Sequence, residues 1–179
     1  MKKSNLTTVI FLMGFMVFVS CKKNEDATHA STPPDPTPNP TVMASLKGSW
    51  KATASELAYD DRASFSEAYL SVNADSTCTW TKKHKTNPSG SLSMSGKLLF
   101  ESTGAKDTSG RLIDKVWFTF NKINGQDLSG SLHGIYQVNG SKLTLDWEFM
   151  RSGIIYPDPS KGFGSGSSNQ KSISRYTKQ

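Results

Sequence analysis

The chain has 179 residues, of which 35% are hydrophobic and 20% charged, and its formal net charge is +6. This composition suits one globular domain of ordinary size and excludes a disordered polyelectrolyte. The lysines are scattered, and no run of five or six basic residues occurs. The positive charge therefore does not indicate a nucleic-acid partner.

The first 20 residues have the form of a secretory signal. Two lysines precede an apolar run over residues 9–19, which is too short to cross a bilayer as a helix. The run ends in Ser20-Cys21, and this junction resembles the lipobox of bacterial lipoproteins. The resemblance implies that Cys21 receives a diacylglycerol and that residues 1–20 are removed. A simple secretory signal with an unrelated cysteine is the alternative.

A lipid on Cys21 predicts attachment to a membrane. Each buried methylene contributes about 0.8 kcal/mol, so two or three acyl chains such as palmitate hold a protein stably. Residues 22–26, Lys-Lys-Asn-Glu-Asp, resemble the surface-export signal of lipoproteins in one phylum of Gram-negative bacteria, although they also suit a plain polar tether. We therefore expect an outer-membrane lipoprotein, on the periplasmic face or the cell surface.

The next segment, residues 21–43, is expected to be a disordered tether. Five prolines fall within residues 31–41 and favour an extended polyproline II spacer, which cannot build a core. The sequence thus divides into a signal (1–20), a lipidated tether (21–43) and a domain (44–179).

Within residues 44–179 the hydrophobic pattern has a period of two. Residues 142–149, Lys-Leu-Thr-Leu-Asp-Trp-Glu-Phe, place all apolar side chains on one face, as in a half-buried strand. Only residues 60–70 leave a helix and a loop followed by a strand equally open. We expect eight strands near 48–57, 67–74, 77–85, 91–101, 112–122, 128–138, 141–150 and 171–178.

The connections between these strands predict the topology. Asn139-Gly140 is a strong hairpin signal, and Asn124-Gly125, Thr103-Gly104 and residues 87–90 punctuate other runs. Longer connections are expected only at 58–66, 102–111 and 151–170. Eight consecutive antiparallel strands predict an all-β, up-and-down barrel that closes and leaves no exposed edge. A β-sandwich is the main competitor.

Three stretches resemble lipocalins. The domain opens with Leu46, Gly48 and Trp50, a Gly-x-Trp at the head of the first strand. Residues 133–147 and the final residues 172–178 are similar to the later strands of lipocalin-like bacterial lipoproteins. The resemblance implies a barrel whose closed end is plugged by Trp50 beneath Arg175. Gly48, Trp50 and Arg175 are then structural.

Residues that would carry catalysis are sparse. His29, His84 and His133 are far apart in the sequence, and no Gly-x-Ser-x-Gly motif occurs. The glycines of residues 162–168 lack a P-loop lysine and predict a flexible loop. Cys78 shares its strand parity with Trp80 and is expected to be buried and reduced. We therefore expect no enzyme, no cofactor and no metal.

Two classes of function stay open. In the first, the barrel holds a small apolar or amphipathic ligand, with the 151–170 loop as a lid. Alternatively the barrel is packed, and the loop, with Ile154, Ile155, Tyr156 and Phe163, binds an envelope protein or a glycan. Strand alternation predicts the ligand-lining residues as Trp80, Met94, Phe118, Tyr136 and Trp147.

Overall fold

The structure is a computed structural model that describes residues 44–179. The expected signal, the lipidated Cys21 and the tether lie outside the described residues. Within these residues, eight strands and three short helical segments follow the helical residues 44–46. They are β1 (Gly48–Thr53), α2 (Tyr59–Arg62), β2 (Phe65–Val72), β3 (Thr77–His84), η1 (Pro88–Gly90), β4 (Leu92–Lys106), β5 (Leu112–Ile123), β6 (Gly130–Asn139), β7 (Lys142–Phe149), η2 (Asn169–Ser172) and β8 (Ile173–Lys178).

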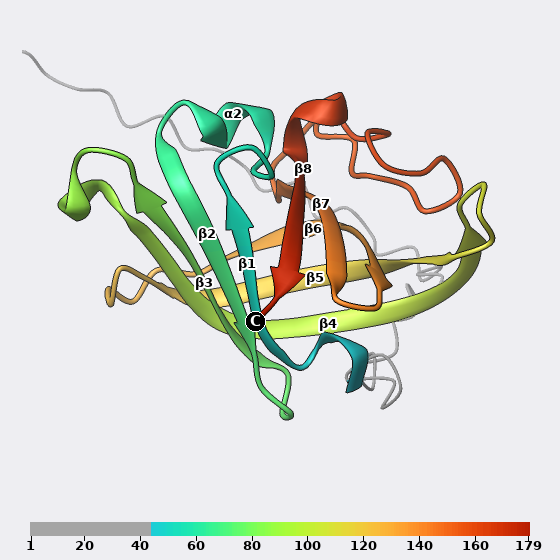
Figure 1. The fold of residues 1–179 in the computed structure, drawn as a ribbon, viewed down its shortest axis with the longest axis horizontal. Helices are drawn as coiled ribbons and strands as arrows, with labels where there is room; N and C mark the ends of the chain where they lie inside the picture. Colours follow the sequence, from blue (N-terminus) through green and yellow to red (C-terminus); the bar gives the residue numbers. More distant parts are fainter. Residues whose placement is uncertain (1–43) are drawn as a thin grey trace, which may run out of the picture. The chain divides into compact units, whose positions relative to one another are not determined.

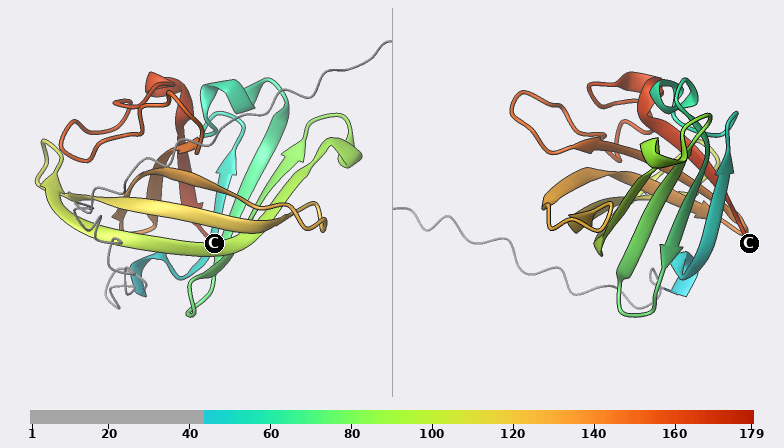
Figure 2. Two further views of the ribbon diagram at one scale, coloured as in Figure 1. Left: turned by 180° about the vertical axis from the view of Figure 1, so that it is seen from behind. Right: turned by 90° about the vertical axis from the view of Figure 1, so that its left-hand side faces the viewer.

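The strands form one closed antiparallel barrel in sequence order, β1 to β8 (Figures 1 and 2). Each strand pairs with the next, and β8 returns to β1 through the register Trp50↔Lys178 and Lys51↔Thr177. The expected up-and-down barrel is confirmed, and the β-sandwich alternative is wrong. Closure removes the unpaired strand edges that a sandwich would expose. All eight strands and the described core lie within 44–179, so this segment holds the contacts that close the barrel.

The β4–β5 hairpin is longer than expected. The predicted turn at Thr103-Gly104 is wrong, because β4 continues to Lys106. Gly104, with a φ of 71°, lies inside the strand, where the pairing with β5 is irregular. The real turn follows at residues 107–111. There the Asp107 carboxylate accepts hydrogen bonds from the backbone N–H of Ser109 (2.8 Å) and of Arg111 (2.9 Å). The position of the turn was therefore decided by a side chain that accepts hydrogen bonds from the backbone of the residues that follow it.

The ambiguous stretch at 60–70 resolves into a short helix followed by a strand. Only Tyr59–Arg62 is helical, and it buries no residue. Phe65 already begins β2, which pairs with both β1 and β3. Cross-strand pairing therefore overrides any local helical preference in this segment.

Alternation along each strand fills the barrel with apolar side chains. Trp50, Met94, Phe118 and Leu143 are among the residues that expose none of their surface. Cys78 is also buried and unpaired, as expected, and burial raises the pKa of its thiol to about 12. Such a thiol is inert at neutral pH and behaves as a small hydrophobe.

The long β7–β8 connection lies against the outer wall of the barrel. Asp146 and Glu148 alternate with the inward Trp147 on β7 and are nevertheless buried. The Asp146 carboxylate accepts hydrogen bonds from Gly164 N–H (2.7 Å) and from the Ser172 hydroxyl (2.5 Å). Glu148 accepts from the Ser168 N–H at 2.6 Å. Two carboxylates on the strand therefore hold the loop in place.

Candidate ligand sites at the two ends of the barrel

The five residues expected to line a ligand cavity do converge inside the barrel. All are buried and belong to one cluster: Trp80, Met94, Phe118, Tyr136 and Trp147. They pack on one another, however. Trp147 makes an edge contact with Trp80 at 4.8 Å between ring centroids and stacks on Phe118 at 5.9 Å. The middle of the barrel is thus filled by side chains, and the hollows lie at its two ends.

One end is closed by Trp50 and the helical residues 44–46 that precede β1. The Trp50 indole N–H donates to the backbone carbonyl of Leu46 at 2.7 Å, and both side chains are buried. The Lys178 ammonium lies 5.2 Å from the centre of the Trp50 ring. The carbonyl thus accepts the hydrogen bond of the indole N–H, and the cation lies over the π-face of the ring.

Lys178 takes the position that the lipocalin resemblance implied for Arg175, and that part of the expectation is wrong. Ser174 and Tyr176 face inward, so Arg175 between them faces outward and is exposed. Lys178 has the inward parity. Gly48 makes room for it, because a Cβ at Gly48 would lie 3.1 Å from the Lys178 Cε, and its φ of 124° also disfavours any other residue.

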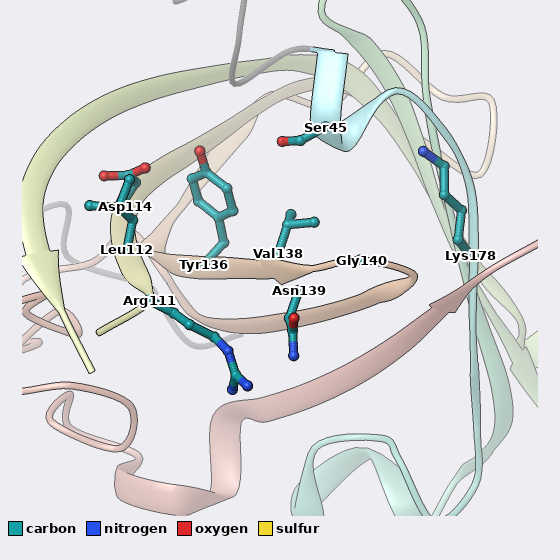
Figure 3. A pocket seen from close by; sticks show the side chains of 9 residues that line it. All are labelled: Ser45, Arg111, Leu112, Asp114, Tyr136, Val138, Asn139, Gly140 and Lys178. Atoms are coloured by element: carbon teal, nitrogen blue, oxygen red, sulfur yellow. The ribbon is translucent and has the colours of Figure 1, made fainter. Parts of the chain in front are cut away.

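Beside this plug lies a hollow of about 610 Å³, named here the Tyr136 hollow (Figure 3). Its apolar walls come from Leu112 and Val138, and the Tyr136 hydroxyl points into it beside Asp114. Two cations lie at its rim on the turn before β5 and at the end of β8. The complete lining is Ser45, Arg111, Leu112, Asp114, Tyr136, Val138, Asn139, Gly140 and Lys178.

Tyr136 and Asp114 form a polar pair on the wall of this hollow. They are directly opposite each other on β5 and β6, and both are buried. Burial, then the negative charge of Asp114 and its hydrogen bond, raise the pKa of the Tyr136 phenol above its ordinary value of 10.0. Asp114 also accepts from the Thr103 N–H at 3.0 Å. The phenol therefore stays protonated at neutral pH, and both the ring and the hydroxyl of Tyr136 border the hollow.

The opposite end holds a smaller hollow of about 200 Å³, named here the Lys82 hollow. Its floor is formed by Trp80 and Trp147, two of the expected ligand-lining residues. Lys82 follows Trp80 with the same inward parity and is buried. Its other lining residues are Ala58, Asp60, Asp61, Leu132, Glu148, Phe149, Arg151, Ser168, Lys171, Ser172 and Ser174.

The Lys82 ammonium is enclosed by aromatic rings and one carboxylate. It lies 4.2 Å from the centre of the Trp80 ring and 5.3 Å from that of Phe65, and it donates to the Asp61 Oδ1 at 2.7 Å. Burial lowers the pKa of Lys82 below its ordinary value of 10.5, and Asp61 partly offsets this. Removing a cation from water costs several kcal/mol, so the rings and the carboxylate must together compensate for that loss.

Two short helical segments cover this end, α2 and η2, which lie side by side in Figure 1. A hydrogen bond of 2.9 Å joins the Ala58 N–H to the Ser174 hydroxyl, and Lys171 lies 5.9 Å from the Tyr59 ring centre. Most of the 150–172 connection lies along the outer face of β7, where Gly164 N–H donates to the Asp146 carboxylate. Of this connection, Arg151 near its start and Ser168, Lys171 and Ser172 near its end line the hollow.

Strand alternation could have found the two charged inward residues that the aromatic search missed. Lys82 shares its parity with Trp80, and Asp114 shares its parity with Phe118. An ionisable side chain at an inward position is a strong signal, since charged residues are rarely buried without a partner. The partner of Lys82, Asp61, comes from a separate element and has no comparable signal in the sequence.

The two histidines in the described part of the chain, His84 and His133, lie apart from each other and pack on aromatic rings. His84 makes an edge contact with Phe65 at 5.9 Å, and His133 packs on Tyr156 at 5.0 Å on the outer wall. Within residues 44–179 no group of three or more histidine, cysteine or acidic residues is placed to hold a metal ion. None of the helices in this part of the chain has the length and apolarity required to cross a membrane.

Comparison of the chain with protein-family models, with curated proteins and with solved structures yielded no match. The class of the protein is therefore given by its fold, a closed eight-stranded antiparallel β-barrel with a packed centre and a hollow at each end.

Proposed function

We propose that this chain is a membrane-anchored, lipocalin-like barrel protein without catalytic activity, which binds a small amphipathic molecule in the Tyr136 hollow. The anchor is the lipid on Cys21, and the location is the outer membrane of a Gram-negative bacterium. Support for the barrel class comes from the closed fold and from Gly48 and Trp50 at its plugged end. Support for the anchor comes from the lipobox alone.

The observation that carries the binding proposal is the size and chemistry of the Tyr136 hollow. Ligand sites usually have volumes of about 300–1,000 Å³, apolar walls and a few placed polar groups. This hollow has a volume of about 610 Å³, with Leu112, Val138 and the ring of Tyr136 as walls and Arg111 and Lys178 at the rim. An apolar tail against the walls and an anionic head between the two cations would match that distribution, as in a fatty acid.

The test is a thermal-shift titration of residues 44–179 with fatty acids, sterols and quinones. A ligand at a hundredfold excess over its Kd stabilises the barrel by about 2.7 kcal/mol, which raises the Tm by about 5–10 °C. Val138→Trp fills the hollow and is expected to abolish the shift. Thr144→Trp, on the outer face of the neighbouring strand, is expected to leave the shift unchanged. No shift with any compound, or an equal shift in Val138→Trp, contradicts the proposal.

The anchor has its own test in the full chain. Cys21→Ala removes the thiol that receives the lipid, and we expect the variant to leave the membrane fraction. Sedimentation of the variant with membranes, as for the unchanged chain, would contradict lipidation at Cys21. Cys78→Ala is the matched control, because that thiol is buried in the barrel.

A second function is favoured by one observation, a groove of about 680 Å³ on the outer surface. Its lining includes Met150, which is 63% exposed, and Tyr156, while Ile155 beside it is 67% exposed. Exposed apolar side chains around a groove are typical of a protein contact. In this alternative the barrel is a packed module that binds an envelope protein or a glycan. Loss of a captured partner in Met150→Ser and Ile155→Ser, with ligand binding absent, would favour it.

A further inference from the structure

Lys82 is unusual because it is a charged residue that faces the barrel interior. It lies at the end of the barrel and lines the hollow there. Its side chain is 9% exposed, and the side chain of its partner Asp61 is 19% exposed. A buried ion pair is weak support for stability, since the cost of removing two charges from water often exceeds their attraction. The fold therefore gains little from placing this pair above Trp80, and a role in binding explains it better.

Asp61 belongs to an element that contributes no side chain to the core. It lies on α2, which has four residues and buries none of them. Asp61 thus brings a carboxylate to Lys82 from outside the barrel, whereas Lys82 is fixed in β3 between the ring of Phe65 and that of Trp80. Exchange of this carboxylate for another would leave the charge of the buried site unchanged.

We propose that Lys82 anchors a second binding site, for the carboxylate of a small organic acid, and that Asp61 occupies this site in the free protein. The bound carboxylate accepts a hydrogen bond from the Lys82 ammonium in place of Asp61, which moves out to solvent. The body of the acid lies in the hollow against Trp80 and Trp147. Arg151 and Lys171 line the same hollow and offset the released charge of Asp61.

Other charges around the hollow are compatible with this exchange. Glu148 is already engaged, since its two oxygens accept from the Ser168 N–H at 2.6 Å and from the Ser168 hydroxyl at 2.9 Å. Asp60 is exposed on α2 and is displaced together with Asp61. The volume of about 200 Å³ restricts the ligand to a single small ring or a short chain, in contrast to the larger Tyr136 hollow. The two sites are therefore separable by ligand size.

The test uses the indole N–H signals of residues 44–179 in two-dimensional ¹⁵N NMR, titrated with benzoate near neutral pH. We expect the Trp80 and Trp147 signals to move together and the Trp50 signal to stay, because Trp50 lies at the opposite end. Benzamide has the same ring without the charge and is expected to cause no shift. Inorganic phosphate distinguishes a carboxylate site from a general anion site, and an equal response to phosphate would contradict the stated ligand class.

Three variants decide the role of Asp61. Asp61→Asn keeps the shape but removes the competing charge, so benzoate is expected to bind about tenfold tighter, as loss of one charged hydrogen-bond competitor implies. Lys82→Gln is expected to abolish binding. Lys83→Gln, at the adjacent exposed position whose partner is Glu67, is the control and binds as the unchanged chain does.

Weaker binding in Asp61→Asn, or unchanged binding in Lys82→Gln, overturns the proposal. The unchanged barrel tests the proposal without any variant, because equal responses to benzoate and benzamide, or no response to benzoate, would also overturn it. The proposed function is tested separately by Val138→Trp in the Tyr136 hollow. Loss of benzoate binding in the Lys82 hollow therefore leaves that test unaffected.

Discussion

The two ends of the barrel each place a lysine against a tryptophan, in opposite surroundings. At one end the exposed Lys178 lies 5.2 Å from the centre of the Trp50 ring. At the other end the buried Lys82 lies 4.2 Å from the centre of the Trp80 ring and also needs the Asp61 carboxylate at 2.7 Å. The same pair of residue types thus covers the plug beside the Tyr136 hollow at one end and forms a charged, exchangeable contact at the other.

The difference follows from the cost of removing a cation from water. An exposed ammonium keeps most of its hydration, so a ring face alone can hold it, with a gain of about 0.5–1 kcal/mol. A buried ammonium loses hydration and requires a counter-charge. The Trp50 end can accordingly be tested by packing and backbone changes, and the Lys82 end by charge changes.

The largest expected effect is at the plug. Trp50→Ala removes a fully buried indole and leaves a cavity, which is expected to cost about 3–5 kcal/mol of the free energy of unfolding. Urea denaturation of residues 44–179 measures this loss. Trp117→Ala, at a half-buried outward position on β5, is the control and is expected to cost much less. Equal losses would show that Trp50 is not a plug.

The charged end is expected to follow. Asp61→Ala leaves Lys82 buried without its carboxylate, at a cost of about 3 kcal/mol. Burial lowers the folded-state pKa of Lys82 from 10.5 and Asp61 raises it, so the pKa of Lys82 is lower still in Asp61→Ala. Between that pKa and 10.5 the unfolded variant binds more protons than the folded variant, and this contribution to its stability rises with pH. The deficit of Asp61→Ala is therefore expected to shrink as the pH rises from neutrality toward 10.5. A deficit that stays constant with pH would show that the charge of Lys82 is not its cause.

The backbone at the plug has a smaller expected effect. Gly48→Ala introduces a Cβ 3.1 Å from the Lys178 Cε at a φ of 124°, and such strain costs about 1–3 kcal/mol. Thermal unfolding measures it. Gly140→Ala is the control for the φ effect alone, since its φ is 58° and no atom lies within 4 Å of the added Cβ. Only Gly48→Ala is expected to displace Lys178, so the two losses should differ.

The smallest expected effect is that of the exposed lysine. Lys178→Ala removes the cation over Trp50 and is expected to cost about 0.5–1 kcal/mol. Arg175→Ala, on the outer face of the same strand, is the control and is expected to leave stability nearly unchanged. A larger loss in Arg175→Ala would restore the arrangement that the lipocalin resemblance implied. Chemical denaturation of both variants makes the comparison.

The strand pattern predicted most of the fold because its period of two is a local property. Hydrophobic alternation located all eight strands, and Asn139-Gly140 located the turn between β6 and β7 correctly. Thr103-Gly104 misled because the Asp107 carboxylate forms the actual turn four residues later. The 162–168 glycines also did not reveal that Asp146 and Glu148 on β7 bind this loop.

Parity along the strands determined, from sequence alone, that Trp80, Met94, Phe118, Tyr136 and Trp147 meet inside one barrel. Only the tertiary structure decided that they pack on one another and leave hollows at the ends, because free volume depends on side chains from all strands at once. The sequence also contained an inward Lys82 and an inward Asp114. Their partners, Asp61 and Tyr136, lie 21 and 22 residues away, and only folding could bring each pair together.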